Sequence, residues 1–121
     1  MKKVVLIADD SPTIRKFVSF SLKMQGFEVL AACDGMEAIE LVTGKKIDLI
    51  ITDLNMPNMD GFELIETLRA NEAYKDVPII ILSSLAGSEE IERGMNTGAN
   101  SYMVKPFDPK RIQYEVAKYL N

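Results

Sequence analysis

Hydrophobic residues along the chain gather in short runs that alternate with longer segments of helical spacing. Four runs are apolar almost throughout, as strands buried on both faces of a sheet are, and they cover residues 4–8, 29–32, 47–51 and 79–83. A shorter fifth run covers residues 102–104. These runs predict five strands.

Each segment between or after the strands carries apolar residues three and four positions apart, which indicates an amphipathic helix. The start signals are a hydroxyl or carboxylate cap, twice followed by proline; they are Ser11-Pro12, Asp34-Gly35, Asp60-Gly61, Ser88 and Asp108-Pro109. The helix over residues 88–97 has the weakest apolar face and contains Gly94, so we expect it to be the element that moves.

Five strands alternating with five helices predict an α/β fold of right-handed βαβ units: a parallel sheet with helices on both faces. In such a sheet the loops that follow all the strands emerge at one edge. Several side chains that can carry chemistry come directly after strands; they are Asp9 and Asp10, Asp53, Ser83 with Ser84, and Lys105. We therefore expect these residues to meet in one crevice, where open α/β sheets bind ligands.

Three ionised carboxylates in one crevice repel, so one must be protonated or a cation must join them. A small set of oxygen ligands that leaves room for water suits Mg²⁺ better than Ca²⁺. Together with Lys105, the cation would favour a phosphoryl substrate, and an aspartate can attack phosphorus to give an acyl phosphate. Ser83 would then donate a hydrogen bond to the phosphoryl group.

The composition of the chain excludes several kinds of catalytic and binding site. The chain has 121 residues, enough for one domain with a real core, and its net charge of -4 argues against direct binding to nucleic acid. It has no histidine, which excludes histidine-based catalytic triads and histidine metal sites. The lone Cys33 excludes a disulfide and is expected to be a buried core thiol. Asp9 and Asp10 interrupt the first apolar run, so we expect neither a signal peptide nor a membrane span. We therefore expect the protein to be cytoplasmic.

Five short motifs in this order resemble the receiver domain of two-component response regulators, of the CheY-like single-domain type; they are Asp9-Asp10, Asp53, Met56-Pro57, Ser83 and Lys105-Pro106-Phe107. The resemblance spans nearly the whole chain. It implies a flavodoxin-like (βα)5 doubly wound fold with strand order 2-1-3-4-5.

The resemblance also implies roles in the crevice. Asp53 would accept a phosphoryl group from a phosphohistidine of a sensor histidine kinase or a histidine phosphotransfer protein. Asp9, Asp10, Asp53 and the backbone carbonyl of Asn55 would bind Mg²⁺ or Mn²⁺. Lys105 would bridge Asp53 and the phosphoryl group, and its bond to Pro106 would be cis.

Ser83 and Tyr102 would form the switch pair that changes the surface read by a downstream target, near Tyr102 and the last two helices. The chain would thus be a regulatory domain in signal transduction, with chemotaxis as one such pathway, that promotes its own phosphorylation and loses the group slowly. Slow loss follows from Leu85, because an apolar side chain beside the path of the attacking water offers it no hydrogen bond.

Each residue also has an ordinary structural explanation. Aspartates favour turns and helix starts, Lys105 could be an exposed lysine, and Tyr102 could be a static edge of the core. Two other functions remain open: an aspartyl-phosphate phosphatase of the dehalogenase-like type, which would need an acid where Asn55 stands, and a flavin-binding module, whose phosphate Asp9 and Asp10 would repel. We expect one receiver domain over residues 1–121 without an output domain; an excised receiver or a phosphorelay intermediate is the alternative.

Overall fold

The computed structural model describes residues 2–106 and 108–120, so Phe107 of the last motif lies outside the described residues. All five expected strands are present and form one parallel sheet in the order β2-β1-β3-β4-β5. The strands are β1 (Val4–Ala8), β2 (Glu28–Ala32), β3 (Leu49–Thr52), β4 (Ile79–Ser83) and β5 (Ser101–Val104). The expected fold class and strand order are confirmed.

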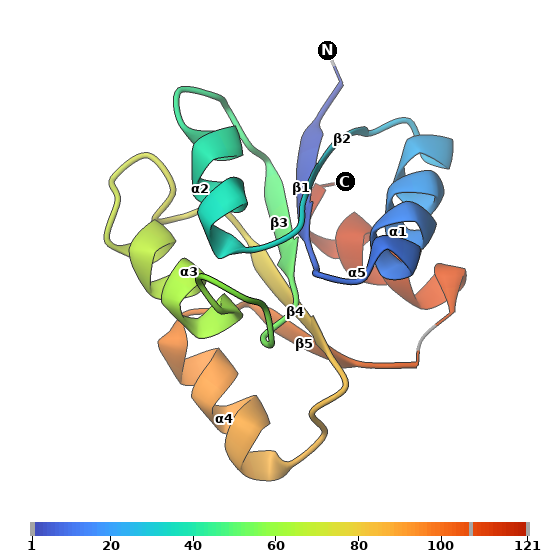
Figure 1. Cartoon of the computed structure of the whole chain (residues 1–121). Coiled ribbons are helices and arrows are strands. Elements are labelled where there is room, and N and C mark those ends of the chain that lie inside the picture. The colour runs from blue at the N-terminus through green and yellow to red at the C-terminus, as the bar shows by residue number, and fades with distance from the viewer. Residues whose placement is uncertain (1, 107, 121) are drawn as a thin grey trace.

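The five helices cover both faces of this sheet. They are α1 (Pro12–Met24), α2 (Gly35–Val42), α3 (Gly61–Arg69), α4 (Ser88–Thr97) and α5 (Pro109–Leu120). Figure 1 shows α1 and α5 on one face and α2, α3 and α4 on the other. None of the helices in the described residues has the length and apolar character that a membrane crossing requires.

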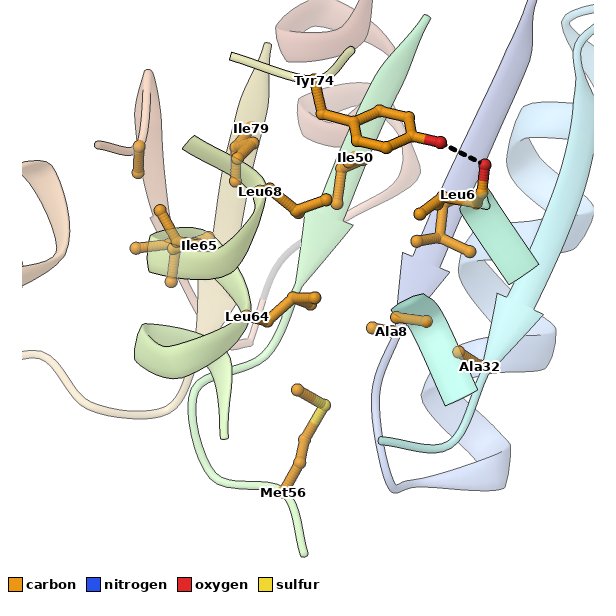
Figure 2. Close-up of a cluster of buried hydrophobic side chains, with 14 of the residues drawn as sticks. Leu6, Ala8, Ala32, Ile50, Met56, Leu64, Ile65, Leu68, Tyr74 and Ile79 are labelled. Carbon is orange, nitrogen blue, oxygen red and sulfur yellow. Dashed lines mark hydrogen bonds between the residues drawn. The ribbon is translucent and has the colours of Figure 1, made fainter. Parts of the chain in front are cut away.

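Strand residues divide alternately between two cores, because successive side chains of a strand point to opposite faces. On β1, Val5 and Ile7 pack with α1 and α5, whereas Leu6 and Ala8 pack with α2 and α3. Figure 2 shows the second of these cores, in which Tyr74 lies over Leu68 and Ile50. The rigid sheet between two filled layers fixes the positions of the residues that follow each strand.

Side-chain caps begin the helices as the sequence predicts, with one exception. The Ser11 hydroxyl accepts from the Ile14 amide at 3.3 Å, and Asp60 forms a capping box with Glu63. Ser88, however, does not cap α4: Gly87 holds the N-cap position and makes no side-chain bond there. Because the cap position falls on a residue without a side chain, the N-terminal end of α4 has no side-chain cap.

The expectation that Cys33 is a buried core thiol is wrong, because its side chain is exposed. Cys33 directly follows β2, which lies at an edge of the sheet and has a neighbouring strand on one side only. The backbone amide of Cys33 donates to the Glu37 carboxylate at 2.7 Å, at the start of α2.

Candidate functional site

Two buried carboxylates form the centre of the site at the ends of the adjacent strands β1 and β3. Asp9 is fully buried and Asp53 is 7% exposed. The amide of Asp53 donates to the Ala8 carbonyl at 2.8 Å, which continues the pairing of the two strands and fixes the acids side by side. One oxygen of each acid is held by a backbone amide: Ser11 donates to Asp9 Oδ1 and Leu54 to Asp53 Oδ1.

Lys105 reaches across from the end of β5 and joins the two acids. Its Nζ lies 3.0 Å from Asp9 Oδ2 and 3.2 Å from Asp53 Oδ2. The Lys105 amide donates to the Ser83 carbonyl at 2.8 Å, so β4 fixes the backbone from which the lysine side chain extends. The Lys105–Pro106 peptide bond is cis, as the resemblance implied.

The pKa values of Asp53 and Lys105 are both raised, for different reasons. Burial, followed by the neighbouring charge of Asp9, raises the pKa of Asp53 above its ordinary value. Burial also lowers the pKa of Lys105, but its contacts with Asp9 and Asp53 outweigh burial, and the net pKa is raised. The lysine therefore stays charged, while ionisation of Asp53 carries a cost that a further cation would relieve.

A third carboxylate completes an acidic cluster. One carboxylate oxygen from each of Asp9, Asp10 and Asp53 lies within 4.8 Å of the others, and Asp10 is exposed to solvent. This is a hard, oxygen-only donor set with an open side, so it fits a divalent cation that keeps bound water. The residues present could hold a metal ion here.

Ser83 and Tyr102 meet at the backbone of Leu85. The fully buried Ser83 Oγ accepts from the Leu85 amide at 3.1 Å, and the Tyr102 hydroxyl donates to the Leu85 carbonyl at 2.7 Å. Ser84 is exposed instead and faces an open, mainly apolar hollow of about 340 Å³. Of the two serines, Ser83 is therefore the one linked to Tyr102.

Sequence reasoning placed the acids, Ser83 and Lys105 together, and the structure brings them to one edge of the sheet. Tyr102, whose role the resemblance implied, lies within β5 and reaches Leu85 through its hydroxyl. Asn55 lies in the loop between β3 and α3 with its side chain exposed, and the role of its carbonyl stays a prediction.

Two supporting residues were missed. Arg15 donates to the Asp9 carbonyl at 2.7 Å, and Gly61 lies so close to the end of β3 that a Cβ there would overlap the Asp53 carbonyl. Neither contact has a signal in the local sequence, because both depend on how separate segments pack.

Comparison with known proteins identifies this arrangement. The family model described as the response regulator receiver domain matches residues 5–117. A chemotaxis protein CheY homolog of Campylobacter jejuni is 37% identical over 118 residues, which are 96% of this chain and 91% of that protein.

Solved structures of response regulators and receiver domains are also similar to this chain. The chemotaxis response regulator CheY4 of Vibrio cholerae is 38% identical, with a TM-score of 0.93 over 99% of this chain and 100% of that one. The receiver domain of the sensor histidine kinase PA1611 from Pseudomonas aeruginosa, solved with a magnesium ion coordinated in its active-site cleft, is 27% identical. Its TM-score is 0.90, over 98% of each chain.

Proposed function

This chain belongs to the response regulator receiver domain family, whose members are phosphorylation-activated signalling switches, and we propose that Asp53 is its phosphoryl acceptor. The observation that carries the proposal is the contact of Lys105 with both Asp9 and Asp53 at the ends of three strands. An acceptor carboxylate beside a fixed cation and an acidic cluster is an arrangement suited to phosphoryl transfer. The dehalogenase-like phosphatase is not favoured over this function.

The donor is a phosphohistidine on a sensor histidine kinase or a histidine phosphotransfer protein. The P–N bond of the donor breaks and leaves its electron pair on the imidazole nitrogen, while a carboxylate oxygen of Asp53 forms the new P–O bond. Lys105 stabilises charge on the phosphoryl oxygens, since its ammonium group already lies 3.2 Å from Asp53. The partner reaches Asp53 beside the apolar hollow lined by Ile14, Phe17, Ser84, Lys105 and Pro106.

Mg²⁺ or Mn²⁺ is the cofactor, held by Asp9, Asp10, Asp53 and the backbone carbonyl of Asn55. Its chemistry is the neutralisation of negative charge on the acids and on the transferred group. The raised pKa of Asp53 supports this assignment, because an added cation favours the ionised carboxylate that must act as nucleophile.

The output of the switch is a changed surface. The Ser83 hydroxyl donates a hydrogen bond to the phosphoryl group and no longer accepts one from the Leu85 amide. Tyr102 then moves as well, because its hydroxyl is hydrogen-bonded to the carbonyl of Leu85. A downstream protein then binds near Tyr102 and the last two helices. We place the protein in the cytoplasm as one receiver domain over residues 1–121, without direct contact to nucleic acid or membrane.

The phosphoryl group is lost slowly because Leu85 offers the attacking water no hydrogen bond. The side chain of Leu85 is partly buried against the core beneath α3. A Leu85→Glu variant should lose the group roughly five- to tenfold faster, the effect of one hydrogen bond of about 1 kcal/mol. A wild-type lifetime shorter than that of the variant would contradict this explanation.

The test of the acceptor is the intact mass of the protein after incubation with acetyl phosphate, with and without Mg²⁺. Wild type should gain one phosphoryl group, about 80 Da, only with Mg²⁺, and Asp53→Asn should gain none. An adduct of equal yield on Asp53→Asn would show that another residue is the acceptor. No adduct on a folded protein that binds Mg²⁺ would contradict the proposed acceptor chemistry.

A further inference from the structure

Asn58 has an unusual backbone conformation in the loop that follows the acceptor. Among residues 2–106 and 108–120 it is the one non-glycine residue with a positive φ, at 67°. The Met59 amide donates to the Pro57 carbonyl at 2.7 Å, so Asn58 is the central residue of a γ-turn. A γ-turn with positive φ is strained, and strain of this kind persists only where neighbouring contacts hold it.

The contacts that hold Asn58 come from the turn before α2. The Asn58 side-chain Nδ2 donates to Asp34 Oδ2 at 2.7 Å, and the Gly35 amide donates to the Met59 carbonyl at 3.0 Å. A Cβ on Gly35 would lie 2.6 Å from that carbonyl, so the two turns are packed backbone to backbone. We call the hydrogen bond between Asp34 and Asn58 the Asp34–Asn58 clamp.

Asp34 is a firm anchor for this clamp. Its Oδ1 accepts from the Glu37 amide at 2.8 Å and caps α2, which leaves Oδ2 for Asn58. These two hydrogen bonds, the backbone one first, lower the pKa of Asp34 and keep it ionised. A hydrogen bond to a charged acceptor is roughly twice as strong as one between neutral groups.

The chain between Asn58 and Asn55 is stiff and transmits the constraint. Proline fixes φ at Pro57, and the residue before a proline is limited to extended conformations, which restricts Met56. Met56 is also buried, at 9% exposure, in the core of Figure 2. The peptide plane that carries the Asn55 carbonyl is therefore held on its C-terminal side by the γ-turn, through two residues with little freedom.

We propose that the Asp34–Asn58 clamp positions the Asn55 carbonyl for the divalent cation, and so makes Asp34 and Asn58 positioning residues of the acceptor site. This inference rests on the proposed function, because it assigns a task to two residues outside the cation's own ligand set. Without the clamp the γ-turn relaxes, the carbonyl turns away, and cation affinity falls while the three carboxylates stay in place. Loss of such an outer contact typically weakens metal affinity by about tenfold to a hundredfold.

The test is the dissociation constant of Mg²⁺, measured by calorimetry on wild type, Asn58→Asp and the double variant Asp34→Asn with Asn58→Asp. Asn58→Asp places two carboxylates face to face and should weaken Mg²⁺ binding about tenfold. Its extra negative charge by itself would strengthen cation binding, so charge alone predicts the opposite sign. In the double variant the amide of residue 34 can donate to the new carboxylate while its oxygen still caps α2, so affinity should return to within about twofold of wild type.

Two further variants separate positioning from general stability. Asn58→Gly tolerates the positive φ but lacks the amide, and it should bind Mg²⁺ as weakly as Asn58→Asp. Tyr74→Phe removes the hydrogen bond to the Val42 carbonyl at the far end of α2; it should lower the free energy of unfolding but leave Mg²⁺ affinity unchanged. Wild-type affinity in Asn58→Asp and Asn58→Gly, or no recovery in the double variant, would overturn the clamp alone. A wild-type protein that binds no Mg²⁺ would overturn the proposed metal site and the clamp with it.

Discussion

The environment of Asp53 disfavours the ionised form of its carboxyl group. It is almost fully buried, and Asp9 lies beside it with Lys105 as their shared counter-ion. One lysine cannot compensate two carboxylates completely, so part of the charge of the pair stays uncompensated until a further cation arrives. The residue that we propose as the acceptor is thus also one that costs the metal-free fold stability.

This cost can be measured with Asp53→Asn. A carboxyl group whose folded-state pKa is raised destabilises the fold when it is ionised, and the penalty disappears as the pH falls through that pKa. Without metal at pH 7, the variant should therefore be more stable than wild type, on the scale of about 1 kcal/mol usual for single substitutions. The difference should shrink as the pH is lowered toward 4, in urea titrations followed by circular dichroism.

Excess Mg²⁺ provides the control for this experiment. Binding to the folded state stabilises wild type more than the variant that lacks one ligand, so the difference at pH 7 should narrow or reverse. A metal-free wild type that is more stable than Asp53→Asn at pH 7 would contradict the electrostatic account.

Residues whose position follows from where a strand ends could be predicted from sequence. Asp9, Asp53 and Lys105 come directly after apolar runs, and parallel strands bring such positions to one edge. The exposure of Cys33 could not be predicted, because it depends on β2 lying at the sheet edge. The contact between Asp34 and Asn58 likewise joins two turns that are distant in sequence.

At the scale of elements, a glycine allows α4 to pack closely against Tyr102. A Cβ on Gly94 would lie 2.6 Å from Ile81 Cδ1 and 3.2 Å from the Tyr102 ring. The missing side chain lets α4 approach the sheet while the ring lies inward, with its hydroxyl on the Leu85 carbonyl. The boundaries of α4 were predicted from its weak pattern, but this reason for its glycine was not, since it depends on the contact with β5.

Gly94→Ala should therefore disturb the switch. Alanine within a helix is normally more favourable than glycine by about 1 kcal/mol. Here the overpacking against Ile81 and Tyr102, which typically costs about 1–3 kcal/mol, should outweigh that gain and displace the ring. Urea denaturation should show lower stability, and the NMR signals of the Tyr102 ring should shift.

Asn96→Ala is the matched control, because Asn96 is an exposed residue on the same helix. It should change stability by less than about 0.5 kcal/mol and leave the Tyr102 signals in place. A Gly94→Ala protein as stable as wild type, with unshifted Tyr102 signals, would show that the ring does not depend on the glycine.

At the scale of the whole molecule, the edge of the sheet opposite the site is tied together by Arg69. Its guanidinium group donates to the backbone carbonyls of Tyr74, Lys75, Val77 and Gly98 and to the side chain of Asn100. Arg69 is the last residue of α3, and its acceptors lie in the turn before β4 and in the turn before β5. One side chain therefore joins the end of α3 to the segments that precede β4 and β5.

Arg69→Lys tests how much this tie contributes. Lysine keeps the charge but lacks the planar fork of donors, so several carbonyls lose their partner. The free energy of unfolding should fall by about 2 kcal/mol, as measured by urea denaturation. Arg111→Lys, at an exposed position of α5, should stay within about 0.5 kcal/mol of wild type. Equal losses in the two variants would show that the fork geometry does not matter.

The hydrogen bonds of Arg69 hold the C-terminal end of α4 and leave its N-terminal end freer to move. Gly98, just after the helix, is bonded to Arg69, whereas Gly87 at the other end offers no side-chain cap. The helix of ten residues is about 15 Å long, so a small tilt about Gly98 moves the Gly87 end farthest. In the chain, the Gly87 end comes shortly after Ser83 and Leu85. A small shift of these two residues beside the acceptor would therefore become a larger displacement of the N-terminal end of α4 on the outer surface.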